Sequence, residues 1–177
     1  VNELKDASYN ATELKDVSFN VSQLKDASFA VVELKEATFT ATEIKEGGFS
    51  ITEIKDASFT AVELKSEGFE ASVLKEAFNA SELKDASYTV IELKDASFNA
   101  IELKEASFTA AELKDASFNA TELKDASFTV IDLKDASFTA LEIKTGGFSI
   151  TEIKDASFTA VELKSEGFTA SDMKDAY

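Results

Sequence analysis

A period of ten residues runs through the whole chain and limits its possible folds more than any other feature. A representative repeat at residues 109–118 reads TAAELKDASF. All 18 lysines follow Leu, Ile or Met, and all 15 Phe and 3 Tyr stand at the end of a repeat. Because one such repeat is too short to bury a core alone, neighbouring repeats must stack and share a linear core.

A second period of 99 residues lies above the first. Residues 47–69 recur without change at 146–168, and two repeats, 99 residues apart, are one residue short. We interpret residues 79–177 as a complete block of ten repeats and residues 1–78 as the last eight repeats of another block. The chain starts mid-pattern without an initiator Met, so we expect a fragment of a longer array. Nothing interrupts the repeats, which predicts a single repeat domain over residues 1–177.

The order of residues around each aromatic side chain predicts one short α-helix per repeat. The residue after the aromatic is Asn, Thr or Ser in 15 of 17 repeats, and Glu or Asp follows three residues later. The exceptions are Ala30, Glu70, Gln23 and Val73. This order is that of a capping box, with the aromatic at N′ and Leu at N4 as a hydrophobic staple. Ser, Thr or Gly before the aromatic suits a left-handed C′ residue. We expect a typical helix over residues 110–116, between Thr109 as N-cap and Ser117 at C′.

A β-solenoid is the alternative. Triplets such as residues 57–59 (ASF) and 52–54 (TEI) resemble those of pentapeptide-repeat proteins. This resemblance implies a right-handed four-sided β-helix over the whole chain. It also implies a function, since some members of that family mimic DNA and inhibit gyrase.

Three observations favour the helices. The slot after the N-cap is Ala, Val or Ile in all 17 repeats. A helix places this N1 slot on one face with N4 and N7, whereas the register of the β-helix, which we call the β frame, turns it to solvent. The β frame also turns Glu67 and Glu166 inward, and burying an unpaired carboxylate is costly. Finally, β-coils about 4.8 Å apart would stack like charges directly, whereas packed helices lie about 8–10 Å apart.

We therefore predict an all-α solenoid of 18 helices, about two turns each, elongated and superhelical. The pattern Glu-Leu-Lys-x-Ala-Gly/Ser-Phe-Ser/Thr resembles the short tandem decapeptide repeats of microbial proteins.

Composition excludes several classes of function. Without Cys or His the chain holds no disulfide framework, zinc finger, thiolate nucleophile or Ser–His–Asp triad. It contains no run of about 18 apolar residues and no visible signal peptide. A net charge of −16 opposes binding to nucleic acid or an anionic membrane. Nothing in the sequence indicates a compartment.

No residue stands out as catalytic, cofactor-binding or metal-binding. We expect the aromatic residues to form the core rather than a stacking platform for bases. We expect the lysines to form an exposed face, neutralised by flanking acids or by acids of the next repeat. Acids three apart, such as Glu13 and Asp16, recur in nearly every repeat and do not match a calcium loop. The glycine pairs at 47–48 and 146–147 lack the Lys-Ser/Thr of a P-loop.

Two breaks in the pattern have structural consequences. Glu70 replaces an N-cap and Val73 replaces the N3 acid of the same helix, so the helix near Ala71 should be the least well capped. The N2 slot varies and holds apolar residues at Val62, Ile91, Ile101, Ile131 and Leu141. These side chains lie either between repeats as core or on the surface as an apolar stripe that marks a partner site.

The sequence thus predicts a non-enzymatic structural or scaffolding repeat protein with an extended acidic surface that binds another protein. Solenoids bind along extended surfaces, and neither end carries a distinctive polar capping repeat, so end-to-end self-association is also expected. We expect no small-molecule substrate, nucleic acid or membrane partner. The alternative is a DNA-mimic inhibitor of a DNA-binding enzyme, which requires the β-helix.

Overall fold

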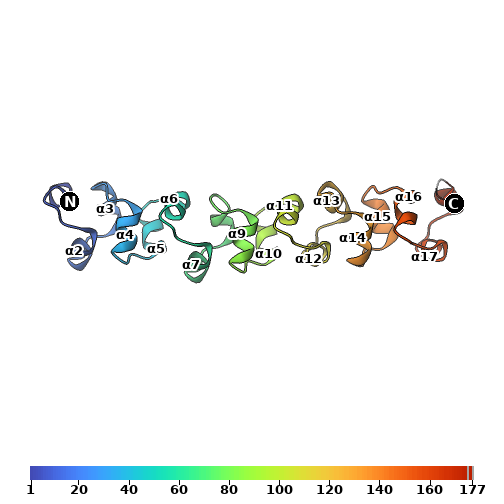
Figure 1. The fold of residues 1–177 in the computed structure, drawn as a ribbon, viewed down its shortest axis with the longest axis horizontal. Coiled ribbons are helices and arrows are strands. Elements are labelled where there is room, and N and C mark those ends of the chain that lie inside the picture. The colour runs from blue at the N-terminus through green and yellow to red at the C-terminus, as the bar shows by residue number, and fades with distance from the viewer. Residues whose placement is uncertain (175, 177) are drawn as a thin grey trace. The chain divides into compact units, whose positions relative to one another are not determined.

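The computed structural model describes residues 1–174 and 176, and this part of the chain forms eighteen short α-helices joined by turns, without a strand (Figure 1). The prediction of one helix per ten-residue repeat is confirmed, and the four-sided β-helix is wrong. No helix in the described residues has the length and hydropathy needed to cross a bilayer. The predictions for Asp175 and Tyr177, in the second short repeat, lie outside the described residues.

The helices follow one another with nearly constant bounds. They are α1 Asn2–Asp6, α2 Ala11–Asp16, α3 Val21–Asp26, α4 Val31–Glu36, α5 Ala41–Glu46, α6 Ile51–Asp56, α7 Ala61–Ser66, α8 Ala71–Leu74, α9 Ala80–Asp85, α10 Val90–Asp95, α11 Ala100–Glu105, α12 Ala110–Asp115, α13 Ala120–Asp125, α14 Val130–Asp135, α15 Ala140–Thr145, α16 Ile150–Asp155, α17 Ala160–Ser165 and α18 Ala170–Met173.

Capping boxes start most of these helices as the sequence predicts, and the helices without a side-chain cap are α1, α4 and α8. At α12 the Glu112 N–H donates to the Thr109 hydroxyl oxygen at 3.2 Å, and the Thr109 N–H donates to a Glu112 carboxylate oxygen at 2.7 Å. The two bonds satisfy backbone donors that the first turn of a helix otherwise leaves open. The helix ends at Asp115, one residue before the predicted end, because Ala116 is its C-cap.

A left-handed residue ends each full-length helix. Ser117 has φ of 64°, its N–H donates to the Lys114 carbonyl at 2.7 Å, and the Phe118 N–H donates to the Leu113 carbonyl at 2.9 Å. These bonds form a Schellman motif, which places the aromatic at C″ of one helix and N′ of the next. Ser, Thr or Gly holds a positive φ at this slot in sixteen repeats, so the predicted C′ residue is confirmed.

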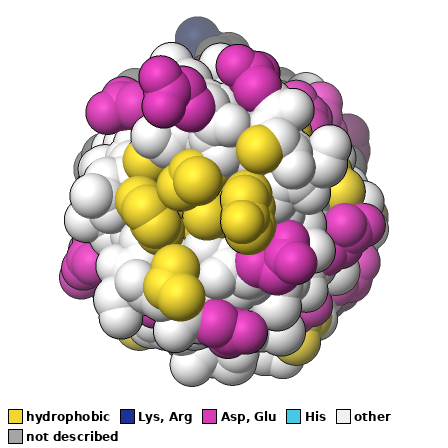
Figure 2. Space-filling model, turned by 90° about the vertical axis from the view of Figure 1, so that its left-hand side faces the viewer, with side chains coloured by type: hydrophobic (Ala, Val, Ile, Leu, Met, Phe, Trp, Pro, Cys, Tyr) yellow, Lys and Arg dark blue, Asp and Glu magenta, His cyan; other side chains and the backbone are white. Residues whose placement is uncertain are grey.

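Four slots of each repeat form the core. In the repeat at 109–118, Ala110 at N1, Leu113 at N4, Ala116 at the C-cap and Phe118 are all buried, and Leu113 is fully inaccessible. The predicted N1, N4, N7 face is therefore confirmed. No polar or charged residue among the described ones is buried. On the face at the N-terminal side of residues 1–88, Figure 2 shows apolar side chains in the middle and acidic side chains around them.

The helices group into two compact segments, residues 1–88 and 89–177. Within each segment a helix packs mainly against the next helix but one. In residues 1–88 the pairs are α2 with α4, α3 with α5 and α7 with α9. In residues 89–177, α11, α13 and α15 form one row, while α12 packs against α14 on the other side (Figure 1).

The interior short repeat departs from this pattern at both ends of its helix. Glu70 makes no side-chain cap at α8, and Val73 offers no carboxylate in return, so the prediction of a poorly capped helix near Ala71 is confirmed. The helix has four residues and no left-handed residue follows it. Instead the Phe78 N–H donates directly to the Leu74 carbonyl at 2.8 Å. The missing residue is thus the C′ position, and the aromatic still reaches the core.

Candidate functional site

In twelve pairs within the two segments, a lysine ammonium lies over the ring of the aromatic two repeats further along. We call this pair of residues a rung. Lys35 Nζ is 4.1 Å from the Phe59 ring centroid, and Lys114 Nζ is 4.4 Å from that of Phe138. The rungs within residues 1–88 are Lys5–Phe29, Lys15–Phe39, Lys25–Phe49, Lys35–Phe59, Lys55–Phe78 and Lys65–Tyr88. Those within residues 89–177 are Lys94–Phe118, Lys104–Phe128, Lys114–Phe138, Lys124–Phe148, Lys134–Phe158 and Lys144–Phe168.

The ammonium of a rung also binds polar groups of two later repeats. Lys35 donates to the Ser58 carbonyl at 2.7 Å, at the end of α6, and lies 3.8 Å from a Glu63 carboxylate oxygen in α7. The carbonyls at a helix C-terminus carry partial negative charge, which a cation neutralises. One lysine of α4 therefore links three helices, and it stabilises both the end of α6 and the start of α7.

The rungs show that these lysines do not form the exposed face that the sequence predicted. The Lys35 side chain is only 31% exposed, and its acidic partner comes from the repeat three further along rather than from a flanking residue or the next repeat. The local pattern did not show this because the contacts join residues 22 to 28 positions apart. The signal was available in the register, since the aromatic follows the Lys by four residues in every repeat except the two short ones.

One rung in residues 1–88 is missing. Lys45 is exposed, and the structure gives its ammonium no ring, carbonyl or carboxylate partner. The N3 residue three repeats later is Val73, where a carboxylate would lie in a regular repeat. The equivalent lysine 99 residues on is Lys144, which binds the carboxylate of Asp172 and lies 4.9 Å from the Phe168 centroid. The break at Val73 thus removes a rung as well as a helix cap.

All acids except Glu67, Glu70 and Glu166 fall into two classes. The first class consists of the N3 acids. They accept a hydrogen bond from the N-cap N–H and, in several repeats, form an ion pair with a rung lysine. Hydrogen bonds from the Ser50 N–H and hydroxyl hold the pKa of Glu53 below its usual range. The Lys144 ammonium, together with the Thr169 hydroxyl and N–H, lowers the pKa of Asp172. Hydrogen bonds to the ionised form stabilise it, so these carboxylates belong to the fold.

The second class consists of the acids directly after the lysines, which we call the post-lysine acids. Asp or Glu holds this slot in fifteen of the eighteen repeats. Within the described residues each one is exposed and makes no hydrogen bond or ion pair, as at Asp85 and Asp115. An acid at the last helical position opposes the dipole of its own helix. The fold therefore gains nothing visible from these acids, although they carry most of the excess negative charge. The described residues contain no group of three or more acids that would hold a metal ion.

The structure resolves the open question of the apolar N2 slot. Ile91, Ile101, Ile131 and Leu141 are between 49% and 59% exposed, and Val62 is 58% exposed. They are surface residues rather than core between repeats. They do not form one continuous stripe, because Ala111 and Thr121 interrupt the slot.

The C-terminal end of each helix lies beside the N-terminal end of the helix two repeats earlier. A Glu67 carboxylate oxygen accepts from the Thr42 N–H at 2.9 Å, and Glu166 accepts from the Leu141 N–H at the same distance. The two carboxylates that the β frame would have buried are therefore surface groups that cap a neighbouring helix. A Cβ on Gly47 would lie 2.2 Å from Val21, so only glycine fits at that C-cap.

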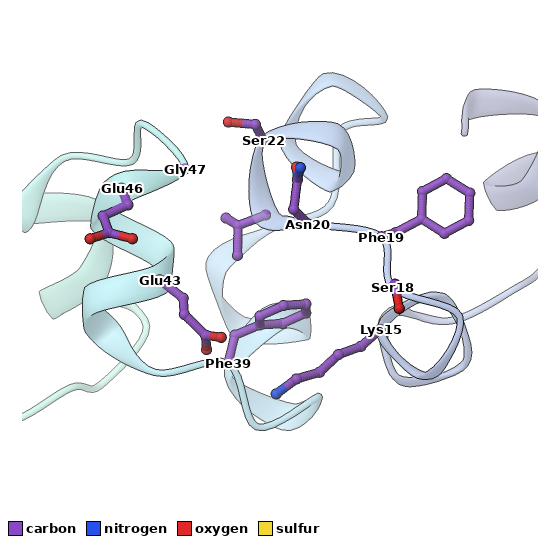
Figure 3. A pocket seen from close by; sticks show the side chains of 10 residues that line it. Lys15, Ser18, Phe19, Asn20, Ser22, Phe39, Glu43, Glu46 and Gly47 are labelled. Carbon is purple, nitrogen blue, oxygen red and sulfur yellow. The ribbon is translucent and has the colours of Figure 1, made fainter.

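Open grooves lie where these helix ends meet. One, with a volume of about 410 Å³, lies between α3 and α5 (Figure 3). In Figure 3 the Lys15 amine lies beside the Phe39 ring, Glu43 and Glu46 come from α5, and Phe19 lies on the opposite side. An equivalent groove of about 400 Å³ lies between α7 and α9. Its lining residues are Lys55, Ser58, Phe59, Thr60, Ala61, Val62, Phe78, Glu82, Asp85 and Ala86. The grooves combine apolar floors with a post-lysine acid at the rim.

Comparison with known proteins gives a family match over the length of the chain. A protein-family model described as "Decapeptide repeat region" matches residues 1–71, 68–140 and 117–177. Comparisons with curated proteins and with solved structures found no match.

Proposed function

We propose that this chain, which belongs to the decapeptide repeat family, is a non-enzymatic structural or scaffolding protein with an extended acidic surface that binds another protein. The observation that carries this proposal is the row of post-lysine acids. Each is exposed and without a partner among the described residues, as at Asp85 and Asp115. A charge that does not serve folding and recurs at a fixed register is suited to attract a complementary surface.

The solenoid supports the same proposal through its geometry. Repeated helices present identical groups at regular intervals, and repeat proteins use such surfaces to bind extended partners. The twelve rungs within the two segments link most repeats to the repeats that follow them. The acidic row is therefore attached to an ordered framework, and a partner would not have to order it on binding.

Affinity capture with a charge-neutralised variant tests the proposal. In the variant the post-lysine Asp and Glu residues are replaced by Asn and Gln. Because those carboxylates make no contacts, far-UV circular dichroism should show the same helical spectrum for both proteins. We expect a partner protein that binds the original chain, releases at high salt, and fails to bind the variant. If the two proteins captured the same partners with equal yield, the acidic surface would not be the binding surface.

The DNA-mimic alternative loses its basis, because it required a β-helix and the chain is helical. End-to-end self-association stays a prediction. Light scattering at increasing protein concentration tests it, and a constant monomer mass would contradict it.

A further inference from the structure

We propose that the groove between α7 and α9, and the grooves along the array that likewise have an apolar residue at N2, bind the lysine or arginine side chains of an extended basic protein segment. This inference rests on the proposed function, because it names the partner class of the same acidic surface. The argument depends on what lines the groove, on which charges in it are already paired, and on how often it recurs.

The α7–α9 groove has one apolar wall, an apolar floor and one acidic wall. Val62, 58% exposed, comes from α7, and Asp85 comes from the end of α9. The buried residues Phe59, Ala61 and Ala86 line the space between them. A lysine side chain has a matching character, because its methylene stem covers apolar surface while its ammonium stays at the rim. The groove thus fits a long cationic side chain better than a short one.

The cation that the fold itself supplies does not neutralise the acidic wall. Lys55 lines the groove, but its ammonium lies over Phe78, 4.5 Å from the ring centroid. It also donates to the Ala77 carbonyl at 2.9 Å and pairs with Glu82 at 2.6 Å. These contacts occupy the ammonium, and Asp85 receives none of them. A cation bound at Asp85 must therefore come from another molecule.

The repeat predicts the same juxtaposition at other places in the chain. Ser22 and Glu46 line one groove 24 residues apart, and the same register predicts that Asp115 lies opposite Ile91 and Asp125 opposite Ile101. In other repeats the N2 residue is polar or small. In the α3–α5 groove, for example, the post-lysine acid Glu46 lies with Ser22 at N2. Several weak sites in one array bind a multivalent ligand more tightly than any single site does. An extended segment with regularly placed cations would gain from this.

Fluorescence anisotropy with two labelled oligomers tests the groove. The first is an oligomer of lysine, and the second is an oligomer of diaminopropionic acid with the same length and charge but a single methylene per side chain. Both are used at a pH where their amines are fully protonated. We expect the lysine oligomer to bind several-fold more tightly, because only its stem is long enough to cover the apolar floor.

Two charge-matched variants locate the binding. The first changes Asp85, Asp115 and Asp125 to Asn, opposite apolar N2 residues. The control changes Glu36, Glu46 and Asp135 to Gln or Asn, opposite Thr12, Ser22 and Ala111. We expect the first variant to bind the lysine oligomer about two- to fivefold more weakly than the control, the effect of ion pairs worth about 0.5–1 kcal/mol.

The outcomes separate this inference from the proposed function. Equal affinity for the two oligomers, together with equal loss in the two variants, would overturn the groove and leave only an unspecific acidic surface. No binding of either oligomer at low salt would overturn the acidic binding surface as well. Circular dichroism of both variants shows that the helices are intact, so a loss of binding cannot come from unfolding.

Discussion

Replacing Lys35 with Met tests the energetic role of a rung. Met keeps much of the apolar stem and removes the ammonium, which lies 4.1 Å from the Phe59 centroid, 2.7 Å from the Ser58 carbonyl oxygen and 3.8 Å from Glu63. A hydrogen bond from a charged donor contributes about 1.5–3 kcal/mol, an exposed cation–π contact about 0.5–1 kcal/mol, and an exposed ion pair about 0–1 kcal/mol. The lysine side chain loses conformational entropy when the rung orders it, and removing the rung recovers about 1.5–2 kcal/mol of that cost. We therefore expect a net loss of about 1–2 kcal/mol.

The matched control is Lys45→Met. Lys45 occupies the same slot one repeat later, but its rung is absent. Its replacement should change the free energy of unfolding by less than about 0.5 kcal/mol, as for most surface substitutions. Urea unfolding followed by far-UV circular dichroism measures both variants, with the slope of the transition checked for equality. A loss of equal size in the two variants, or no loss in Lys35→Met, would refute the stabilising role of the rungs.

Three further predictions follow from single slots of the repeat. Val73→Asp should raise the free energy of unfolding by about 0.5–1 kcal/mol, since it supplies a carboxylate to Lys45 and an acid to the first turn of α8; an unchanged urea midpoint would contradict this. Ser117→Gly should stabilise by up to about 1 kcal/mol, because Ser117 has a positive φ that costs a residue with a Cβ more than glycine; thermal unfolding measures it, and a lowered Tm would count against it. Glu63 has a pKa lowered chiefly by the Thr60 N–H, so its contribution to stability is present above the unfolded pKa of about 4.3 and is lost as pH falls through the lower folded value. Glu63→Gln should therefore show a flatter decrease of Tm below that pH than the original chain, and an identical slope would argue against the cap.

Local rules predicted the helix and both of its ends. Thr109 and Glu112 form a capping box, and Ser117 takes the left-handed conformation, because each of these contacts joins residues within one repeat. Propensity and capping depend on sequence neighbours alone. The end of α12 was misplaced by a single residue, since Ala116 is apolar and buried whether it is the last helical residue or the C-cap.

The roles of the charged residues could not be predicted in the same way. Whether Lys35 faces water or the Phe59 ring depends on how helices two repeats apart stack, and the ten-residue pattern is compatible with both. The capping role of Glu112 was predicted, but the local pattern did not show that Glu112 would bind a cap while Asp115 of the same helix makes no side-chain contact. The difference arises from the direction in which each side chain leaves the helix, which composition does not encode.

The rungs also bear on how an array of this kind changes its length. The boundary between the two sequence blocks lies after Phe78, yet Lys55 of the first block pairs with Glu82 of the second, and Lys65 lies 4.1 Å from the Tyr88 centroid. Each regular repeat carries the donor for a later repeat and the acceptor for an earlier one. A duplication or loss of whole repeats by unequal recombination therefore regenerates complete contacts at the new junction. Selection can lengthen or shorten such a gene without first repairing a core.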